Sequence, residues 1–152
     1  LLQWQLRDKV TRIIQKDPRD GDNARQIVAA LDVLPNLRAD QAIPVLVKRV
    51  EVKPAVRFFL IDDMGPELAS FPYAKCLACM GRDAVPVIIG YLKQNPDPKA
   101  FSDKAIELYA RATRNIYGPS GREESIAVIE FHLSKQPQGN LNRLLEAVKA
   151  LD

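Results

Sequence analysis

The chain has 152 residues, a length that fits one domain with a hydrophobic core of its own. Hydrophobic residues make up 47% and charged residues 27%, which excludes wholesale disorder, and the net charge of +3 is too small to indicate nucleic-acid or membrane binding by itself. One histidine and two cysteines cannot supply the four ligands of a structural zinc site.

Amphipathic helices are predicted along the whole chain, because apolar residues recur at helical spacing between short polar turns. Asn23 is the predicted cap of the second helix, Ser102 or Asp103 caps a later one, and Gly81 and Gly118 end helices. The predicted helices are Trp4–Gln15, one after Asn23, Asp40–Val50, Tyr73–Met80, Arg82–Leu92, one after Ser102 or Asp103, Glu124–Leu133, and a last one from Asn140.

Three of these stretches resemble one another: Asp40–Val50, Arg82–Leu92 and, more weakly, Glu124–Leu133. Ala42 and the equivalent Ala84 are 42 residues apart, and Ser125 follows 41 residues later. Both intervals fall within the period of about 40–47 residues expected for repeats made of paired helices.

The repeated stretch is predicted to be a helix, although its β-branched residues are also common in strands. Pro44 and Pro86 follow Asp40 and Asp83 within a few residues, as expected in the first turn of a helix, where no hydrogen bond is lost. A proline there would interrupt a central strand. The apolar face of the first two copies is Ile43, Leu46, Val47 and Val50, then Val85, Ile88, Ile89 and Leu92.

The segment Arg82–Pro98 resembles the second helix and following turn of HEAT-like repeats, in particular the short repeats of phycobilisome lyases. Asp17-Pro18, Asp97-Pro98, Gly81 and Gly118 occupy the turn positions of that family pattern. The resemblance implies an all-α fold over residues 1–152, a short superhelix (α-solenoid) of about three helical hairpins with terminal helices. Because the family consists mostly of binding scaffolds, it also implies a non-catalytic function.

No run of about 18 apolar residues is present, so no transmembrane helix is predicted and the protein is expected to be soluble. The chain opens with Leu1-Leu2-Gln3-Trp4, without an initiator methionine or a signal sequence. We therefore expect a mature form or a part of a longer chain, and the compartment stays open.

Cys76 and Cys79 are the one pair that suggests chemistry. A redox dithiol needs a thiolate with a lowered pKa, typically at a helix N-terminus, whereas this pair lies near the predicted C-terminus of its helix. Core packing is the favoured interpretation, and a dithiol or cofactor-handling (lyase-like) protein is the alternative.

Two further groups of polar residues are weaker candidates. His132 has no second ligand at suitable spacing, so we expect a partly exposed histidine and no catalytic base. Asp62, Asp63 and Glu67 lack the spacing of a calcium loop, so no metal or other cofactor is predicted. They lie in Val52–Pro72, a segment longer than a usual repeat turn, which is expected to carry contacts.

Residues at equivalent positions of the repeats are expected to stack. Arg49, Tyr91 and His132 would form one column, and Lys48, Gly90 and Phe131 the column beside it. Arg and aromatic residues are enriched at protein interfaces. The predicted protein-binding residues are therefore Lys48, Arg49, Tyr91, Phe131 and His132, with packing between repeats as the alternative role for Tyr91 and Phe131.

The sequence thus favours a protein–protein interaction scaffold with an unidentified protein or peptide partner. Nucleic-acid binding is a second alternative, because Lys48, Arg49, Lys53 and Arg57 form a basic stretch. Four cations over ten residues, with Glu51 among them, are few for that role.

Overall fold

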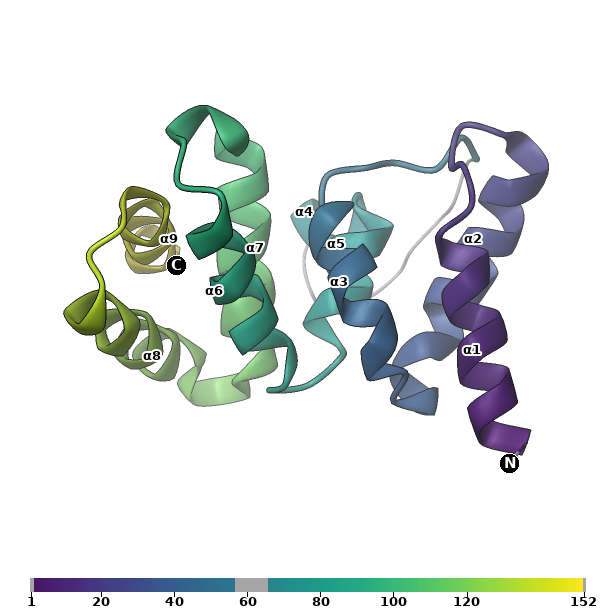
Figure 1. Cartoon of the computed structure of the whole chain (residues 1–152), viewed down its shortest axis with the longest axis horizontal. Helices are drawn as coiled ribbons and strands as arrows, with labels where there is room; N and C mark the ends of the chain where they lie inside the picture. The colour runs from purple at the N-terminus through teal and green to yellow at the C-terminus, as the bar shows by residue number, and fades with distance from the viewer. Residues whose placement is uncertain (1, 57–65, 152) are drawn as a thin grey trace.

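The computed structural model describes residues 2–56 and 66–151, and within these ranges it is all helical, without strands. Helices follow one another along the long axis of the molecule, from α1 at one end to α8 and α9 at the other (Figure 1). The elements are α1 (Leu2–Ile14), α2 (Gly21–Leu37), η1 (Asp40–Ala42), α3 (Ile43–Lys48), α4 (Pro66–Ala69), α5 (Pro72–Ala78), α6 (Ala84–Gln94), η2 (Pro98–Ala100), α7 (Asp103–Ile116), η3 (Gly118–Ser120), α8 (Gly121–Lys135) and α9 (Gly139–Ala150).

The three similar stretches are helices, as predicted. Pro44 lies in the first turn of α3, and Pro86 in the first turn of α6. The predicted apolar faces point into the core, since all eight residues are at most 2% exposed: Ile43, Leu46, Val47, Val50, Val85, Ile88, Ile89 and Leu92.

The helix caps match the sequence in one case and differ in another. The side chain of Ser102 accepts a hydrogen bond from the amide of Ala105 and so caps α7, as predicted. The predicted cap Asn23 is wrong, because α2 begins earlier, and the carboxylate of Asp20 accepts hydrogen bonds from the amides of Asp22 and Asn23. Both residue types cap helices well, and the one that precedes the first turn takes the role.

Buried apolar residues from α1 to α9 form one continuous core. Within it, α1 packs against α2; α2, α5 and α7 contact one another in that order; and α3 contacts α5 and α6. At the other end, α9 packs against α6, α7 and α8, and Figure 1 shows it running almost along the line of sight. Among the described helices, none combines the length and the apolar character needed to cross a bilayer.

Two glycines fix the junction between α7 and α8. Gly118 has a φ of 71°, a left-handed conformation that is unfavourable for residues with a side chain, and it ends α7 as predicted. Gly121 opens α8, and a Cβ atom there would overlap the backbone carbonyl oxygen of Arg114. The absence of a side chain at Gly121 therefore lets the start of α8 approach the end of α7.

Polar side chains attach α9 to the turn after α6. Asn140, which is fully buried, donates hydrogen bonds to the carbonyl oxygens of Asn95 (2.6 Å) and Asp97 (3.2 Å). Gln138 both caps α9, through the amide of Leu141, and donates to the carbonyl oxygen of Leu92. These bonds hold the last helix against α6 and the turn that follows it.

Candidate functional site

Arg49 follows α3 directly, but its guanidinium is directed at the end of α1. Its two terminal nitrogens donate hydrogen bonds of 2.8–2.9 Å to the carbonyl oxygens of Ile14, Gln15 and Lys16. These carbonyls lie at the C-terminal end of a helix, where a cation is stabilised by unpaired acceptors and by the helix dipole. Arg49 therefore joins α3 to α1.

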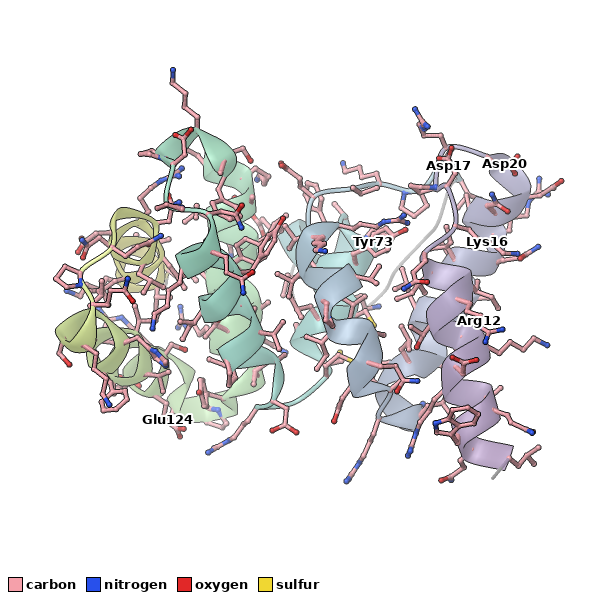
Figure 2. The ribbon with its side chains drawn as sticks, in the orientation of Figure 1. Arg12, Lys16, Asp17, Asp20, Tyr73 and Glu124 are labelled. Carbon is pink, nitrogen blue, oxygen red and sulfur yellow. The ribbon has the colours of Figure 1, made fainter. Side chains whose placement is uncertain are left out.

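Tyr73 completes this contact. Arg49 Nη1 donates to the Tyr73 hydroxyl at 3.1 Å, and the guanidinium carbon lies 5.8 Å from the centre of the ring. Burial raises the pKa of Tyr73, so the phenol stays neutral and accepts this bond. Figure 2 shows Tyr73 across from the chain that follows α1, where Lys16 is labelled.

The other described members of the basic stretch are Lys48 and Lys53, and Arg57 is outside the described residues. Lys48 is exposed at the end of α3. Lys53 lies over the ring of Phe71, 4.7 Å from its centre. With Arg49 engaged on α1, two described cations of this stretch are left to contact a phosphate, which is few for a nucleic-acid surface.

Tyr91 is half-buried on α6 and makes an edge-to-face contact with Phe101, with 5.5 Å between ring centres. Phe101 makes a second such contact with Tyr109, whose hydroxyl donates to the carbonyl oxygen of Val47. Tyr91 therefore belongs to an aromatic row that packs α6 against α7 and α3, the alternative role considered from the sequence.

His132 is half-buried on α8 and lies beside Lys93 of α6, with 3.1 Å between Lys93 Nζ and His132 Nδ1. Because a lysine ammonium has only donors, Nδ1 is the acceptor, and the imidazole proton is on Nε2. Partial burial, together with the positive charges of Lys93 and Lys135, lowers the pKa of His132. The imidazole is therefore neutral at pH 7.

Phe131 precedes His132 and is 57% exposed, the one strongly exposed large apolar side chain described outside α1 and α2. The ring of His132 meets it edge to face at 5.7 Å, and Lys135 Nζ lies 4.7 Å from its ring centre. Phe131, His132, Lys93 and Lys135 form one surface, which we call the α8 edge.

The α8 edge contains two of the predicted residues and two that were not predicted. Phe131 and His132 belong to it, whereas no hydrogen bond, ion pair or ring contact between described residues joins them to Arg49 or Tyr91. The sequence predicts that Tyr91 lies beside His132. In the structure, Lys93 lies there instead. The tertiary arrangement that brings Lys93 of α6 to α8 decides which residue meets His132, and no local sequence pattern reports it.

The two cysteines lie in different surroundings. Cys76 is 4% exposed within α5, and burial, with a smaller effect of Cys79, raises the pKa of its thiol. Cys79 is exposed at the C-terminal end of α5. The prediction that the cysteines pack in the core is therefore confirmed for Cys76 and wrong for Cys79. A buried thiol with a raised pKa is a poor nucleophile.

Two shallow grooves elsewhere each contain an ion pair. The groove between α7 and α9, about 440 Å³, is lined by Asp103 and Arg143, which form an ion pair of 2.9 Å. The groove beside Trp4 on α1, about 480 Å³, contains an Asp8–Arg12 pair of 2.7 Å. Asp62 and Asp63 lie outside the described residues, and no metal-binding group of three ligands occurs within the described part of the chain.

Comparison of the chain with protein-family models, with curated proteins and with solved structures found no match in any of the three.

Proposed function

We propose that the chain is a short α-solenoid of HEAT-like helical pairs that acts as a protein-interaction scaffold and binds its partner at the α8 edge. The pairs are α2 with α3, α5 with α6, and α7 with α8, and α1 and α9 cover the two ends. Partner binding is assigned to the last pair.

Equivalent positions in the three similar stretches support the repeat. Ala42, Ala84 and Ser125, which are separated by 42 and 41 residues, are all fully buried. One turn later, Leu46, Ile88 and Ile129 are fully buried as well. A recurring two-helix unit that buries the same face on its neighbour accounts for both sets.

Contacts between helices also support this arrangement. The first helices of the pairs contact one another in the order α2, α5 and α7, and of the second helices α3 contacts α6. Arg82, in the turn before α6, forms an ion pair of 3.3 Å with Glu124 of α8 across 42 positions, and Lys93 of α6 meets His132 of α8 across 39 positions. Glu124 extends from α8 at one end of Figure 2. Each pair thus contacts the next pair, and α9 packs on α6 as well as on α7 and α8. Contact between neighbouring units is what a solenoid requires.

The exposure of Phe131 carries the assignment of the binding surface. Ser125 and Ile129 of α8 face the core, Ile126 and Val128 are half-buried, and Phe131 lies off this face and is exposed. The ring of Phe131 is therefore available to a partner. An exposed aromatic ring beside cations is also the composition of a protein-binding hot spot.

The alternative functions receive less support. Cys76 is buried with a raised pKa, which weighs against a dithiol or cofactor-handling protein. The engagement of Arg49 on α1 weighs against a basic nucleic-acid surface.

Site-specific photo-crosslinking tests the proposal. Benzoylphenylalanine at position 131 is expected to crosslink a partner in extracts of the source cells, and the same group at position 4 is the control, because Trp4 is also exposed, at 64%. With the purified partner, calorimetry is expected to show at least about tenfold weaker binding for Phe131→Ala, the loss typical of a hot spot.

The control variant is Trp4→Ala, which removes an exposed aromatic ring at the opposite end of the molecule. It is expected to bind the partner within about twofold of the unaltered chain, since that change corresponds to only about 0.4 kcal/mol. Equal crosslinking at positions 4 and 131, none at 131, or unchanged binding by Phe131→Ala contradicts the proposed surface.

A further inference from the structure

The α8 edge combines an apolar anchor with cations that lack acidic partners. Neither Lys93 nor Lys135 has a carboxylate within ion-pair distance among the described residues; their contacts are the imidazole of His132 and the ring of Phe131. Lys104 and Lys149, by contrast, each pair with a glutamate one turn away. The positive charge at the α8 edge is therefore not neutralised by an ion pair with any of the residues that the structure describes.

Two acidic side chains of α8, Glu124 and Glu130, do not cancel this charge. Glu124 of α8 is engaged by Arg82 at 3.3 Å and by the hydroxyl of Ser120 at 2.6 Å. Glu130 is exposed, and consecutive residues of a helix point about 100° apart, so its side chain leaves α8 in a different direction from Phe131. The charge beside Phe131 is consequently positive on balance.

His132 gives the α8 edge a hydrogen-bond donor in addition to the two lysines. Lys93 occupies the lone pair of Nδ1, so the other ring nitrogen carries the proton and can donate to an acceptor on a bound molecule. Lys93 is fixed by the same contact, which reduces the entropy it loses when it binds an anion. Phe131, in contact with both His132 and Lys135, supplies apolar area next to these donors.

We propose that the α8 edge binds an acidic peptide segment, in which an apolar side chain contacts Phe131 and neighbouring carboxylates contact Lys93 and Lys135. This inference rests on the proposed function and specifies the chemistry of its partner. Charge complementarity selects this occupant, since carboxylates supply a negative charge that the described residues do not place beside Lys93 and Lys135. A nucleic acid would need a longer row of cations than two lysines beside one aromatic ring.

Selection from a phage-displayed library of random dodecamer peptides tests the chemistry directly. Peptides that bind the unaltered chain are selected first, and those that also bind Phe131→Ala are then removed. The remaining peptides are expected to be enriched in Asp or Glu next to a large apolar residue. Neutral or basic peptides that depend on Phe131 would overturn the acidic specificity while leaving the proposed function intact. If no peptide depends on Phe131, both proposals fall.

The single histidine makes a second, site-specific measurement possible. Its imidazole NMR signals report the α8 edge alone, and they are expected to shift when the most enriched acidic peptide is added. The matched peptide with Gln and Asn in place of Glu and Asp is expected to bind at least about tenfold more weakly. Equal binding of the two peptides contradicts the proposal, as does a dT20 oligonucleotide that shifts these signals with equal affinity.

Charge-removing variants locate the contact. Lys93→Gln and Lys135→Gln are each expected to weaken binding of the acidic peptide by about two- to fivefold, the range of exposed ion pairs, and their combination by about tenfold. The control is Lys99→Gln, which removes an exposed lysine from the turn after α6 without touching the α8 edge. If Lys99→Gln weakens binding as much as Lys93→Gln, net charge rather than this site holds the peptide, and the inference is wrong.

Discussion

α6 and α8 come from similar stretches of sequence, yet their apolar residues are placed differently. α6 buries its whole apolar face: Ala84, Val85, Ile88, Ile89 and Leu92. α8 fully buries only Gly121, Ser125 and Ile129 and has exposed Glu130 at the position equivalent to Ile89. It carries Phe131 on the outside instead, where α6 has Gly90. One helical unit can therefore serve the core or a partner, depending on which side of the helix holds its apolar residues.

The largest expected difference is in stability, between Ile88 and Phe131. Ile88→Ala removes a fully buried side chain of α6 and is expected to cost about 2–5 kcal/mol of the free energy of unfolding. Phe131→Ala is expected to change it by no more than about 0.5 kcal/mol, because the ring is mostly exposed. Urea unfolding measures both, and a similar loss in the two variants would show that Phe131 supports the fold.

Arg49 is expected to behave as a residue of the fold, although the sequence marks it as a binding residue. Arg49→Gln removes the guanidinium from three carbonyl oxygens at the end of α1 and is expected to cost about 1–2 kcal/mol. At this chain length 1 kcal/mol corresponds to about 2–4 °C in Tm. The exposed neighbour provides the control, and Lys48→Gln is expected to leave Tm unchanged; equal effects of the two variants contradict this role.

Substitutions of two serines compare α7 with α8, and their expected effects on the free energy of unfolding are smaller. Ser102→Ala removes the cap of α7 and is expected to cost about 1 kcal/mol. Ser134→Ala removes a hydroxyl that donates to the carbonyl oxygen of Phe131 at the exposed end of α8, and a change within about 0.5 kcal/mol is expected. Thermal unfolding distinguishes them, and a larger loss for Ser134→Ala would mean that the end of α8 contributes more to stability than its exposure indicates.

The smallest expected effect is on the pKa of His132, measured from its imidazole NMR signals. The pKa is expected below the ordinary 6.5, and Lys93→Gln is expected to raise it by removing a neighbouring positive charge. Because the folded value lies below the unfolded one, the unfolded chain binds more protons there, and stability falls as the pH drops below about 6.5. A pKa above 6.5 in the unaltered chain would contradict the contact with Lys93.

Most of the helical organisation could be predicted from the sequence, because it follows from local pattern. Ile43, Leu46 and Val47 recur at helical spacing around the first-turn Pro44, and they are buried on one face of α3 as expected. The cap of α2 could not be fixed in the same way, since Asp20 and Asn23 are both suitable and their places differ by one turn.

The role of Arg49 could not be predicted, for a different physical reason. Its acceptors are backbone carbonyl oxygens of residues 33–35 positions away, and every residue has a carbonyl, so no side-chain pattern reports them. The sequence indicates the exposure of Phe131 only weakly, because this residue lies off the helix face that contains Ser125 and Ile129. Its cationic neighbours come from another helix and from the next turn, which only the packing brings together.

The close approach at Gly121 has a consequence for how such a protein can diversify. A larger residue at this position would push the start of α8 away from Arg114 and change the direction of the whole helix, so glycine is expected to persist at 121 in homologous chains. The outward residues around position 131 are free of that constraint. Across homologues we therefore expect the residues around position 131 to vary together with the partner, while the direction of α8 stays the same.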